Sequence, residues 1–426
     1  MSDVLKLGAR IGCLTLLLTQ AALAQTWTNR IGNQTCSPAE FCTPNTLEEL
    51  CQAVTQANAK HLKIHAIGNG FSPSEIGCCD GVLLHLGHLS RVLSVHLSTG
   101  RVRVEAGISL CDLHETLAYY GLALPNQPAM DLISLGGALS TGVHGTGHTG
   151  TLSQFVEEIE LLTADGRLLR LSPKDGDLFA AANVGLGALG ILYAVTLQCE
   201  PSFKVHAATS LMDIETILAQ YPTLHASNDF FQLVWNATTG ACVVQTWNRA
   251  DCSETHDPAA VPAYQALRYY TFDPNDHDLF SEIAVPVEQL PETIKAIQGL
   301  AQKHRAQGAT VCDICVRFVD ADPKSLLSPS AGRAVAYFTY SLSNQETYLT
   351  CYREFEEVLT SLGGRPHWGK TNFMNHQKAT AVYGENLTRF LQVKSLLDPH
   401  GRFSTPYLDR VLSASCEMAS SAEFIK

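Results

Sequence analysis

The sequence predicts an α+β protein with more than one domain, and three observations lead to this prediction. The chain has 426 residues, a length typical of roughly two to three domains. From Leu62 to Glu200, short β-rich runs alternate with glycine turns, and helical stretches are few. From about 202 to 365, longer helical stretches separate the strand-like runs, which indicates a second α+β domain.

The first 24 residues are typical of a cleavable secretory signal. Lys6 and Arg10 precede an apolar run, and small residues at 22–24 stand before Gln25. The run is shorter than the ~20 residues that a membrane-spanning helix needs, and no later run is long and apolar enough. We therefore expect cleavage after Ala24, a secreted or periplasmic location and no membrane span. An uncleaved N-terminal anchor is the alternative.

Charge and cysteine content narrow the function classes. The formal net charge is −12, and no basic run with interleaved aromatic residues occurs, so we expect no nucleic-acid partner. One of the 14 cysteines lies in the signal, which leaves an odd number in the mature chain and at least one unpaired thiol. Cys36, Cys42 and Cys51 are close enough in sequence for a local disulfide, but spacing does not give the connectivity.

Local patterns predict the elements of the first domain. Alternating residues around a polar-glycine turn predict hairpins at 92–107 and 159–171, and helical spacing at 109–124 stops at Gly121. The glycines of GLGALG at 185–190 match the dinucleotide-binding fingerprint. However, a helix-like stretch precedes them and a β-rich stretch follows, which is the reverse of a Rossmann turn. We predict a helix-to-strand turn there.

The second half predicts helices at 211–220, 288–305 and 345–362, strands such as FFQLVW and AVAYFTY, and a helical closing part that begins at RPHWGK. The pair CDIC at 312–315 lies in a strand-like run, so we interpret it as structural or as facing a pocket. The histidine pairs in HLGH and HGTGH lack carboxylates at helical ligand spacing, so we expect no metal site.

Two segments have more glycine and hydroxyl groups than a turn requires. They are AIGNGFSPSEIG at 66–77 and SLGGALSTGVHGTGHTG at 134–150, the second with six glycines in seventeen residues. Glycine allows a ligand to approach the backbone, and hydroxyl groups add donors. Two such loops in one β-rich domain predict a cradle that grips a pyrophosphate from both sides. An ordinary pair of surface loops is the alternative.

These segments carry a resemblance to a known family. IGNGFSPSEI, SLGGALSTGVHGTG, TADGRLLRLS and LGALGILYAVTLQC, in this order, resemble the FAD-binding domain of the vanillyl-alcohol oxidase superfamily. EIAVPVEQLPE, VRFVDAD, RPHWGK and LDPHGRFSTPYLDRVL are similar to its sugar-lactone and alditol oxidase branch, the relatives of gulonolactone oxidase and arabinonolactone oxidase. The similarity extends from about 40 to 412.

The resemblance implies a two-subdomain PCMH-type FAD-binding domain at 25–201, an α+β cap domain over the substrate at 202–365 and a C-terminal segment at 366–426 that returns to the FAD site. It implies a flavoenzyme that oxidises an alcohol group of a sugar lactone, alditol or related polyol, with oxygen or another acceptor reoxidising the flavin. The implied FAD-binding residues are Gly68, Asn69, Gly70, Ser72, Ser74, Ser134, Gly137, Ser140, Thr141, Gly142, His144, Gly145, Gly190 and Ile191. The implied catalytic residues are Lys370, Arg317 and His367.

The chain departs from the family pattern at two positions. Members with covalent FAD have a histidine where this chain has Phe71, so we expect noncovalent FAD. The substrate-facing Glu-x-Arg pair reads Cys315-Val316-Arg317, so a carboxylate that would accept substrate hydroxyls and face Arg317 is missing. We therefore expect a substrate with fewer hydroxyls at that position, or one with an anionic group. A reductase that uses NADPH and a noncatalytic flavin- or sugar-binding protein are the alternative functions.

Overall fold

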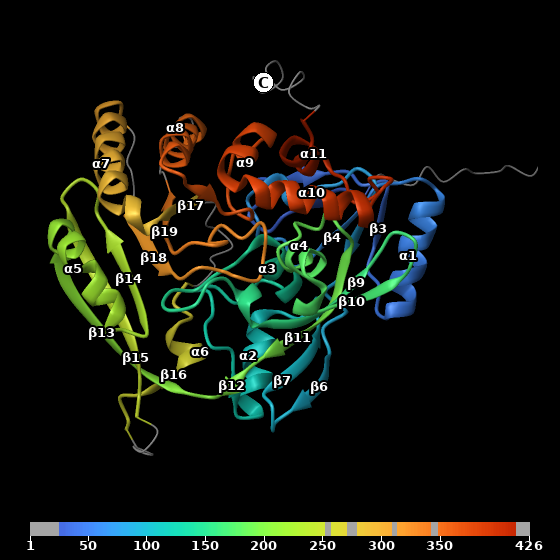
Figure 1. Cartoon of the computed structure of the whole chain (residues 1–426), viewed down its shortest axis with the longest axis horizontal. Coiled ribbons are helices and arrows are strands. Elements are labelled where there is room, and N and C mark those ends of the chain that lie inside the picture. Colours follow the sequence, from blue (N-terminus) through green and yellow to red (C-terminus); the bar gives the residue numbers. More distant parts are fainter. Residues whose placement is uncertain (1–24, 252–256, 271–278, 309–312, 342–347, 415–426) are drawn as a thin grey trace, which may run out of the picture.

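The computed structural model describes residues 25–251, 257–270, 279–308, 313–341 and 348–414. Figure 1 shows two lobes side by side, with the cap domain (yellow and light green) at the left and the N-terminal domain (blue to green) at the right. The proposed signal at 1–24 lies outside the described residues. No helix in the described ranges is both long and apolar enough to cross a membrane.

Two main sheets form the N-terminal domain. A parallel sheet has the order β3-β5-β4, and an antiparallel sheet has the order β10-β9-β11-β7-β6. The strands of this domain are β1 Trp27–Thr28, β2 Thr35–Cys36, β3 Glu40–Cys42, β4 Ile64–Ile67, β5 Val82–His85, β6 Val92–His96, β7 Arg101–Glu105, β8 Leu122–Ala123, β9 Val156–Leu162, β10 Leu168–Leu171, β11 Ile191–Gln198 and β12 Glu200–Pro201. Its helices are α1 Leu47–Ala59, α2 Leu110–Tyr119, α3 Leu135–Thr141 and α4 Asp177–Asn183, with short 3₁₀ turns η1 Glu75–Gly77, η2 Leu152–Phe155 and η3 Pro173–Asp175.

Apolar spacing explains how these helices pack. In α1, Leu50, Val54 and Ala57 are buried at helical spacing, and the Thr46 side chain caps the first turn by accepting from the Glu49 amide at 3.2 Å. Both predicted hairpins are confirmed as the antiparallel pairs β6–β7 and β9–β10. The helix-to-strand turn at 185–190 is confirmed too, because α4 precedes it and β11 follows it.

The cap domain is one large sheet with helices packed against it. Its order is β16-β13-β15-β14-β18-β19-β17-β20. The strands are β13 Lys204–Asp213, β14 Phe230–Trp235, β15 Ala241–Arg249, β16 Val261–Pro262, β17 Phe280–Pro286, β18 Ile314–Val319, β19 Val335–Ser341 and β20 Arg365–Pro366. The helices are α5 Ile214–Ala226, α6 Ala263–Ala266, α7 Leu290–Ala306 and α8 Tyr348–Ser361, with η4 Val287–Gln289 before α7.

Strand alternation divides the cap sheet into an apolar face and a polar face. Val316 and Phe318 of β18, Phe338 of β19 and Ile283 of β17 belong to a buried apolar cluster that also contains residues of α5, α7 and α8. The residues between them in sequence, including Cys315, Arg317, Thr339 and Glu282, point to the opposite face. That face turns toward the N-terminal domain, so the strand pattern itself delivers polar side chains to the domain boundary.

The C-terminal segment returns to the N-terminal domain. It contains the helices α9 His376–Tyr383, α10 Glu385–Leu397 and α11 Pro406–Leu412, which Figure 1 shows in orange and red along the top of the molecule. Side chains from this segment, such as Trp368, Phe390 and Leu408, join the same apolar cluster as Leu113 and Leu139 of the N-terminal domain. The core therefore fixes residues 366–375 beside the domain boundary.

Several sequence predictions differ from the structure. The predicted helix at 211–220 begins later, since residues up to Asp213 extend β13. The closing part is not helical at its start, because Arg365–Pro366 pairs with β17. The second glycine segment is not all loop, because Leu135, Ala138 and Leu139 are buried and turn 135–141 into α3. Residues 345–347 and Cys312 lie outside the described residues.

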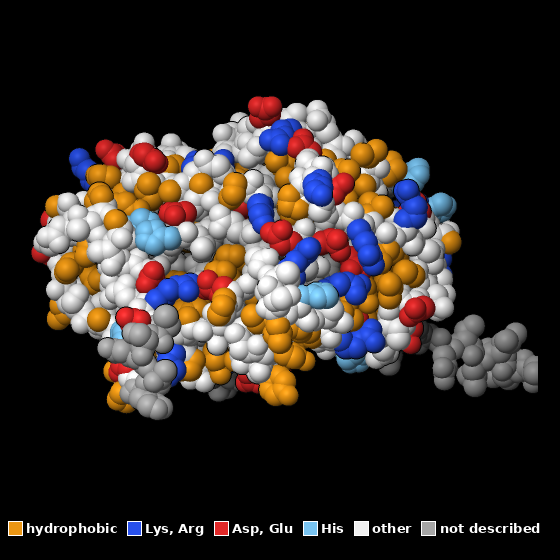
Figure 2. Space-filling model, turned by 60° about the horizontal axis from the view of Figure 1, so that its bottom comes forward, with side chains coloured by type: hydrophobic (Ala, Val, Ile, Leu, Met, Phe, Trp, Pro, Cys, Tyr) orange, Lys and Arg blue, Asp and Glu red, His pale blue; other side chains and the backbone are white. Residues whose placement is uncertain are grey.

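Charge is mixed on the face drawn in Figure 2, where Lys and Arg side chains are interspersed with Asp and Glu side chains. The ten cysteines in the described ranges, Cys36, Cys42 and Cys51 among them, are thiols. Cys36 contacts Cys78 rather than its neighbours in sequence; burial raises the pKa of Cys78, and the hydrogen bond with Cys36 adds to this effect.

Candidate active site

A cavity of about 340 Å³ lies where the two glycine segments, the polar face of the cap sheet and the C-terminal segment meet. Such a volume falls in the usual range for ligand sites. Trp27 of β1 and Gly190 before β11 line it from the N-terminal domain, Arg317 from the cap, and Lys370 from the C-terminal segment.

The two glycine segments touch each other inside this cavity. A Cβ atom on Gly68 would lie 1.7 Å from Ser134 Oγ, so only glycine allows this approach. Ser134 in turn caps α3, since its hydroxyl accepts from the Gly137 amide at 3.3 Å. The tertiary structure thus brings together two loops that are about sixty residues apart in sequence.

Most of the expected FAD-binding residues line the cavity, but not all of them. The lining residues are Gly68, Asn69, Gly70, Ser72, Ser134, Gly137, Ser140, Thr141, His144 and Gly190. The structure places Ser74, Gly142, Gly145 and Ile191 behind the wall. Ser74, for example, is buried and donates to the Trp368 carbonyl at 2.8 Å, which ties the first loop to the C-terminal segment.

Glu282 is the central acidic residue of the site, and the sequence reasoning missed it. It lies on β17 opposite Thr339 of β19, and Thr339 lies opposite Cys315 of β18. The Arg317 Nη2 atom donates to Glu282 Oε1 at 2.5 Å, and the Thr339 hydroxyl donates to the same oxygen at 2.6 Å. Glu282 is 2 % exposed, so this ion pair is buried in the cavity wall.

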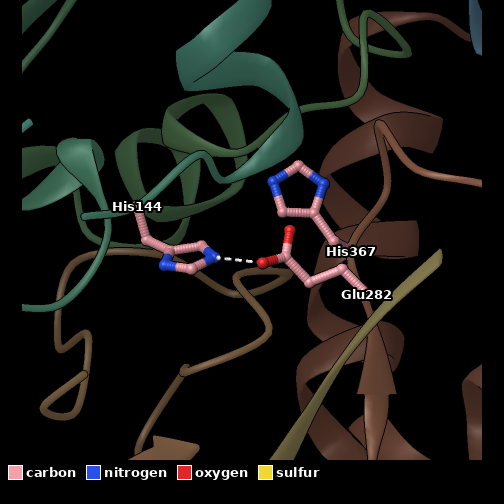
Figure 3. A group of neighbouring side chains, drawn as sticks. All are labelled: His144, Glu282 and His367. Carbon is pink, nitrogen blue, oxygen red and sulfur yellow. Dashed lines mark ion pairs between the residues drawn. The ribbon is translucent and has the colours of Figure 1, made fainter. Parts of the chain in front are cut away.

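Two histidines flank the Glu282 carboxylate, as Figure 3 shows. His144 Nε2 lies 3.4 Å from Glu282 Oε1, and the His144 ring stacks on Tyr337 with 3.5 Å between ring centroids. On its other side, His144 Nδ1 contacts the Gly145 carbonyl at 2.8 Å, so Nδ1 carries a proton. Burial lowers the pKa of His144, although the charge of Glu282 opposes this shift.

The charges at this site are set by burial and by Arg317. Burial alone raises the pKa of Glu282, but the charges of Arg317 and His144 outweigh it and hold the pKa well below its usual range. Burial also lowers the pKa of Lys370, against the opposing influence of Glu282. Glu282 is therefore a fixed anion and a poor base, whereas Lys370 loses a proton more readily than an exposed lysine.

His367 is fixed as a neutral hydrogen-bond donor. Burial lowers its pKa to about 3, and its Nδ1 atom accepts from the Gly369 amide at 3.0 Å. The proton of the neutral ring is therefore on Nε2. His367 can donate a hydrogen bond in the site, but it cannot serve as the base through Nδ1.

The position of the missing carboxylate is occupied by other polar groups. Burial raises the pKa of Cys315, so its thiol is neutral. Cys315 Sγ lies 3.9 Å from Gln232 Oε1, and the Tyr269 hydroxyl donates to that same oxygen at 2.5 Å. Gln232 is fully buried and donates to Gln245 at 2.7 Å. Position 315 carries no carboxylate, but Glu282 of β17 supplies an anionic partner for Arg317, which the sequence did not lead us to expect.

Comparisons with known proteins decide the family. Residues 38–172 match the family model of an FAD-binding domain, and residues 195–274 and 264–411 match the model of D-arabinono-1,4-lactone oxidase. An alditol oxidase from Streptomyces sp. is 31% identical, with 90% of this chain and 98% of the relative aligned. The chain belongs to the D-arabinono-1,4-lactone oxidase family. It is accordingly an FAD-dependent oxidoreductase.

Other family relatives and one fold neighbour agree with this assignment. The L-gulonolactone oxidase of Bos taurus is 28% identical over 91% of this chain and 97% of its own length. The L-gulono-1,4-lactone dehydrogenase of Mycobacterium tuberculosis is 29% identical over 91% of this chain and 99% of its own length. A solved cholesterol oxidase from Brevibacterium sterolicum has the same fold, with a TM-score of 0.74 at 16% identity, and covers 91% of this chain and 96% of its own length.

The cavity fits the FAD that the family binds. Glycines leave the backbone open where Gly68 meets Ser134, and two residues of the cavity wall have a buried polar atom without a protein partner. In the described part of the chain, His65 Nδ1 and Arg317 Nε have no hydrogen-bond partner. Both residues line the cavity. A large polar ligand supplies such partners, as buried polar groups require.

The sequence contained a signal for one of the missed residues and none for the others. Glu282 lies in the EIAVPVEQLPE run that carries the resemblance, and a lone acidic residue in an apolar strand suggests a buried function. Sequence spacing could not reveal the other three residues, Gln232, Tyr269 and Thr339. They reach the site from separate strands and a loop.

Proposed function

We propose that the protein oxidises an alcohol group of a sugar lactone, an alditol or a related polyol. The observation that carries this proposal is the placement of two basic side chains, Lys370 and Arg317, in one cavity wall beside the glycine segments. FAD, when bound, accepts the hydride from the alcohol carbon. The names of the relatives, which act on lactones and alditols, support the same class.

Each polar residue has a distinct task in this reaction. Lys370 orients the substrate hydroxyl and, because burial lowers its pKa, its unprotonated form accepts the hydroxyl proton. Arg317 stabilises negative charge that develops on the substrate oxygen. Glu282 holds Arg317 in place and keeps it charged, since it raises the pKa of Arg317 against the effect of burial. His367 donates a hydrogen bond through Nε2.

The cavity wall favours a substrate with fewer hydroxyls than an aldonolactone at one end. At that end Tyr269 lies beside Cys315, and Phe280 and Met130 also line the cavity. The thiol of Cys315 is a weaker hydrogen-bond acceptor than a carboxylate. An anionic substrate is no longer needed to balance Arg317, because Glu282 does so. We therefore favour a neutral polyol that carries an apolar group toward Tyr269.

The test is anaerobic reduction of the protein-bound flavin, followed as loss of its yellow colour. A panel of aldonolactones, alditols and sterols identifies the substrate class, and NADPH in the same assay tests the reductase alternative. Lys370→Ala and Arg317→Ala are expected to slow reduction while the flavin stays bound. Bleaching by NADPH alone would replace the proposal with the reductase, and no bleaching by any alcohol would favour a binding protein.

Addition of air to the reduced protein then identifies the electron acceptor. We propose that oxygen reoxidises the flavin and yields hydrogen peroxide. Rapid return of the colour together with peroxide would support an oxidase. A colour that returns only with an added dye would instead mean a dehydrogenase.

We also propose that the protein is exported and cut after Ala24. The support is the charged and then apolar start of the sequence. Such a cut retains β1, whose Trp27 lines the cavity. Mass spectrometry of the secreted or periplasmic protein should find an N-terminus at Gln25. A chain that retains Met1 in the cytosol would contradict the proposal.

A further inference from the structure

Three potential metal ligands meet on the outer side of the boundary between the two domains. They are His148, which follows the second glycine segment, His225 near the end of α5, and Asp320 directly after β18. Asp320 Oδ1 lies 3.2 Å from His225 Nε2, and Asp320 Oδ2 lies 3.8 Å from His148 Nδ1. One ligand atom from each residue lies within 4.8 Å of the other two.

These separations suit a zinc-type ion. Nitrogen and oxygen ligands bind Zn²⁺ at about 2.0–2.2 Å, so two ligand atoms on a tetrahedron are roughly 3.3 Å apart. The 3.2 Å separation between Asp320 Oδ1 and His225 Nε2 is close to this value, and the 3.8 Å separation between Asp320 Oδ2 and His148 Nδ1 is about 0.5 Å longer. Two imidazoles with one carboxylate also form a ligand set that divalent transition metals prefer.

Backbone hydrogen bonds hold the segments of His148 and Asp320 together, and a ring contact positions His225. The Gly147 amide donates to the Phe318 carbonyl at 2.7 Å, and the Asp320 amide donates to the Thr149 carbonyl at 3.2 Å. The His225 ring stacks on Tyr221, with ring centroids 5.7 Å apart and planes 15° apart. The loop with His148 and the strand with Asp320 are therefore paired before any ion binds.

The two imidazole rings already lie close together, with 4.4 Å between their centroids. In the structure, His225 Nε2 is within hydrogen-bond distance of Asp320 Oδ1, at 3.2 Å. A divalent cation would take the place of this hydrogen bond, because imidazole nitrogen and carboxylate oxygen are both ligands for such ions.

The cluster is also accessible to an ion from solvent. His148 and Asp320 are 44% and 43% exposed, whereas His225 is 16% exposed. Three protein ligands and an open side leave room for water in the fourth position.

We propose that His148, His225 and Asp320 form a binding site for a zinc-type divalent cation, which links the second glycine segment to the cap domain. The bound ion links two parts of the chain. One is the loop that follows His144, and the other is β18, the strand that carries Arg317. Metal binding thereby stabilises the contact between the N-terminal domain and the cap domain. The site lies outside the catalytic cavity and takes no part in the hydride transfer.

The experiment measures zinc bound per chain in the purified holoenzyme. The protein is dialysed against Zn²⁺ and then against metal-free buffer, and its metal content is determined. His148→Ala and Asp320→Asn are each expected to lose one equivalent relative to wild type. His96→Ala, which removes an exposed histidine far from the cluster in sequence, is the matched control and should retain it.

A second measurement separates the site from nonspecific binding. Zn²⁺ is expected to raise the unfolding temperature of wild type and of His96→Ala, and to leave that of His148→Ala unchanged, while the flavin spectrum reports that each variant is folded. The proposal is overturned if wild type retains no zinc, or if His148→Ala and Asp320→Asn retain as much zinc as the control.

Discussion

Arg317 on β18 and Glu282 on β17 form a buried ion pair across β19, with 2.5 Å between Nη2 and Oε1. Thr339 on the middle strand bonds to both residues. The pair explains how the chain keeps a charged, largely buried guanidinium in the cavity wall although Cys315 replaces the expected glutamate. It also ties the position of Arg317 to a strand that is distant in sequence.

Glu282→Gln should destabilise the protein by about 3–5 kcal/mol, because it leaves the Arg317 charge buried without a partner. Glu40→Gln, which breaks the exposed pair with Lys60, should cost at most about 1 kcal/mol. Denaturant unfolding at pH 7 measures both. Since folding lowers the pKa of Glu282, its stabilisation is present above the unfolded value of 4.5 and is lost as the pH falls through the folded value. Equal stability of the two variants would contradict the role of the pair.

Cys315→Glu should speed flavin reduction by aldonolactones about tenfold, because a carboxylate beside Arg317 accepts a substrate hydroxyl that the thiol binds poorly. Cys315→Gln is the matched control, since it has the same length without the charge. Rapid mixing under anaerobic conditions gives the reduction rates. If glutamate and glutamine give the wild-type rate, position 315 does not contact the substrate.

Gly68→Ala should weaken FAD binding, because the added Cβ would lie 1.7 Å from Ser134 Oγ and push the two loops apart. Gly299→Ala is a control in α7, where a Cβ meets nothing within 4 Å. The ratio of bound flavin to protein after gel filtration measures the effect. A full complement of flavin in Gly68→Ala would show that the close approach of the loops is dispensable.

His114 should make the protein less stable in mild acid. Burial lowers its pKa to about 4 from 6.5, so the unfolded chain takes up a proton that the folded chain does not. This effect is absent well above pH 6.5, where both states are neutral, and the resulting loss of stability grows as the pH falls from 6.5 toward 4. Relative to pH 7, His114→Leu should lose about 2 kcal/mol less at pH 5 than wild type. Urea unfolding at both pH values tests this, with His96→Leu expected to behave as wild type.

FAD should be released by acid, because Phe71 has no nitrogen for a covalent bond to the flavin. Phe71 lines the cavity, and the resemblance implies that members with covalent FAD have their linking histidine at this position. Precipitation with acid should leave the yellow colour in the supernatant. Colour that remains in the washed pellet would mean a covalent link through another residue.

The sequence by itself determined several local elements and, through its resemblance to a known family, the cofactor class. Alternation and turn residues gave both hairpins of the N-terminal domain, and apolar spacing gave α7 within two residues of its predicted bounds. The glycine segments indicated a pyrophosphate cradle, because glycine at close backbone contacts is a local requirement, and their resemblance to a known FAD-binding domain implied FAD. All of these signals act over a few residues, so they can be read without knowledge of the fold.

Only the tertiary structure decided how the polar groups combine. Glu282, Thr339 and Cys315 lie side by side because register sets three strands against one another, and register depends on contacts across the whole sheet. The same holds for His148, His225 and Asp320, which come from three separate elements. The glycine-rich segment 135–141 became a helix for a similar reason, since burial of Leu135 and Leu139 against the core outweighed the conformational freedom of its glycines.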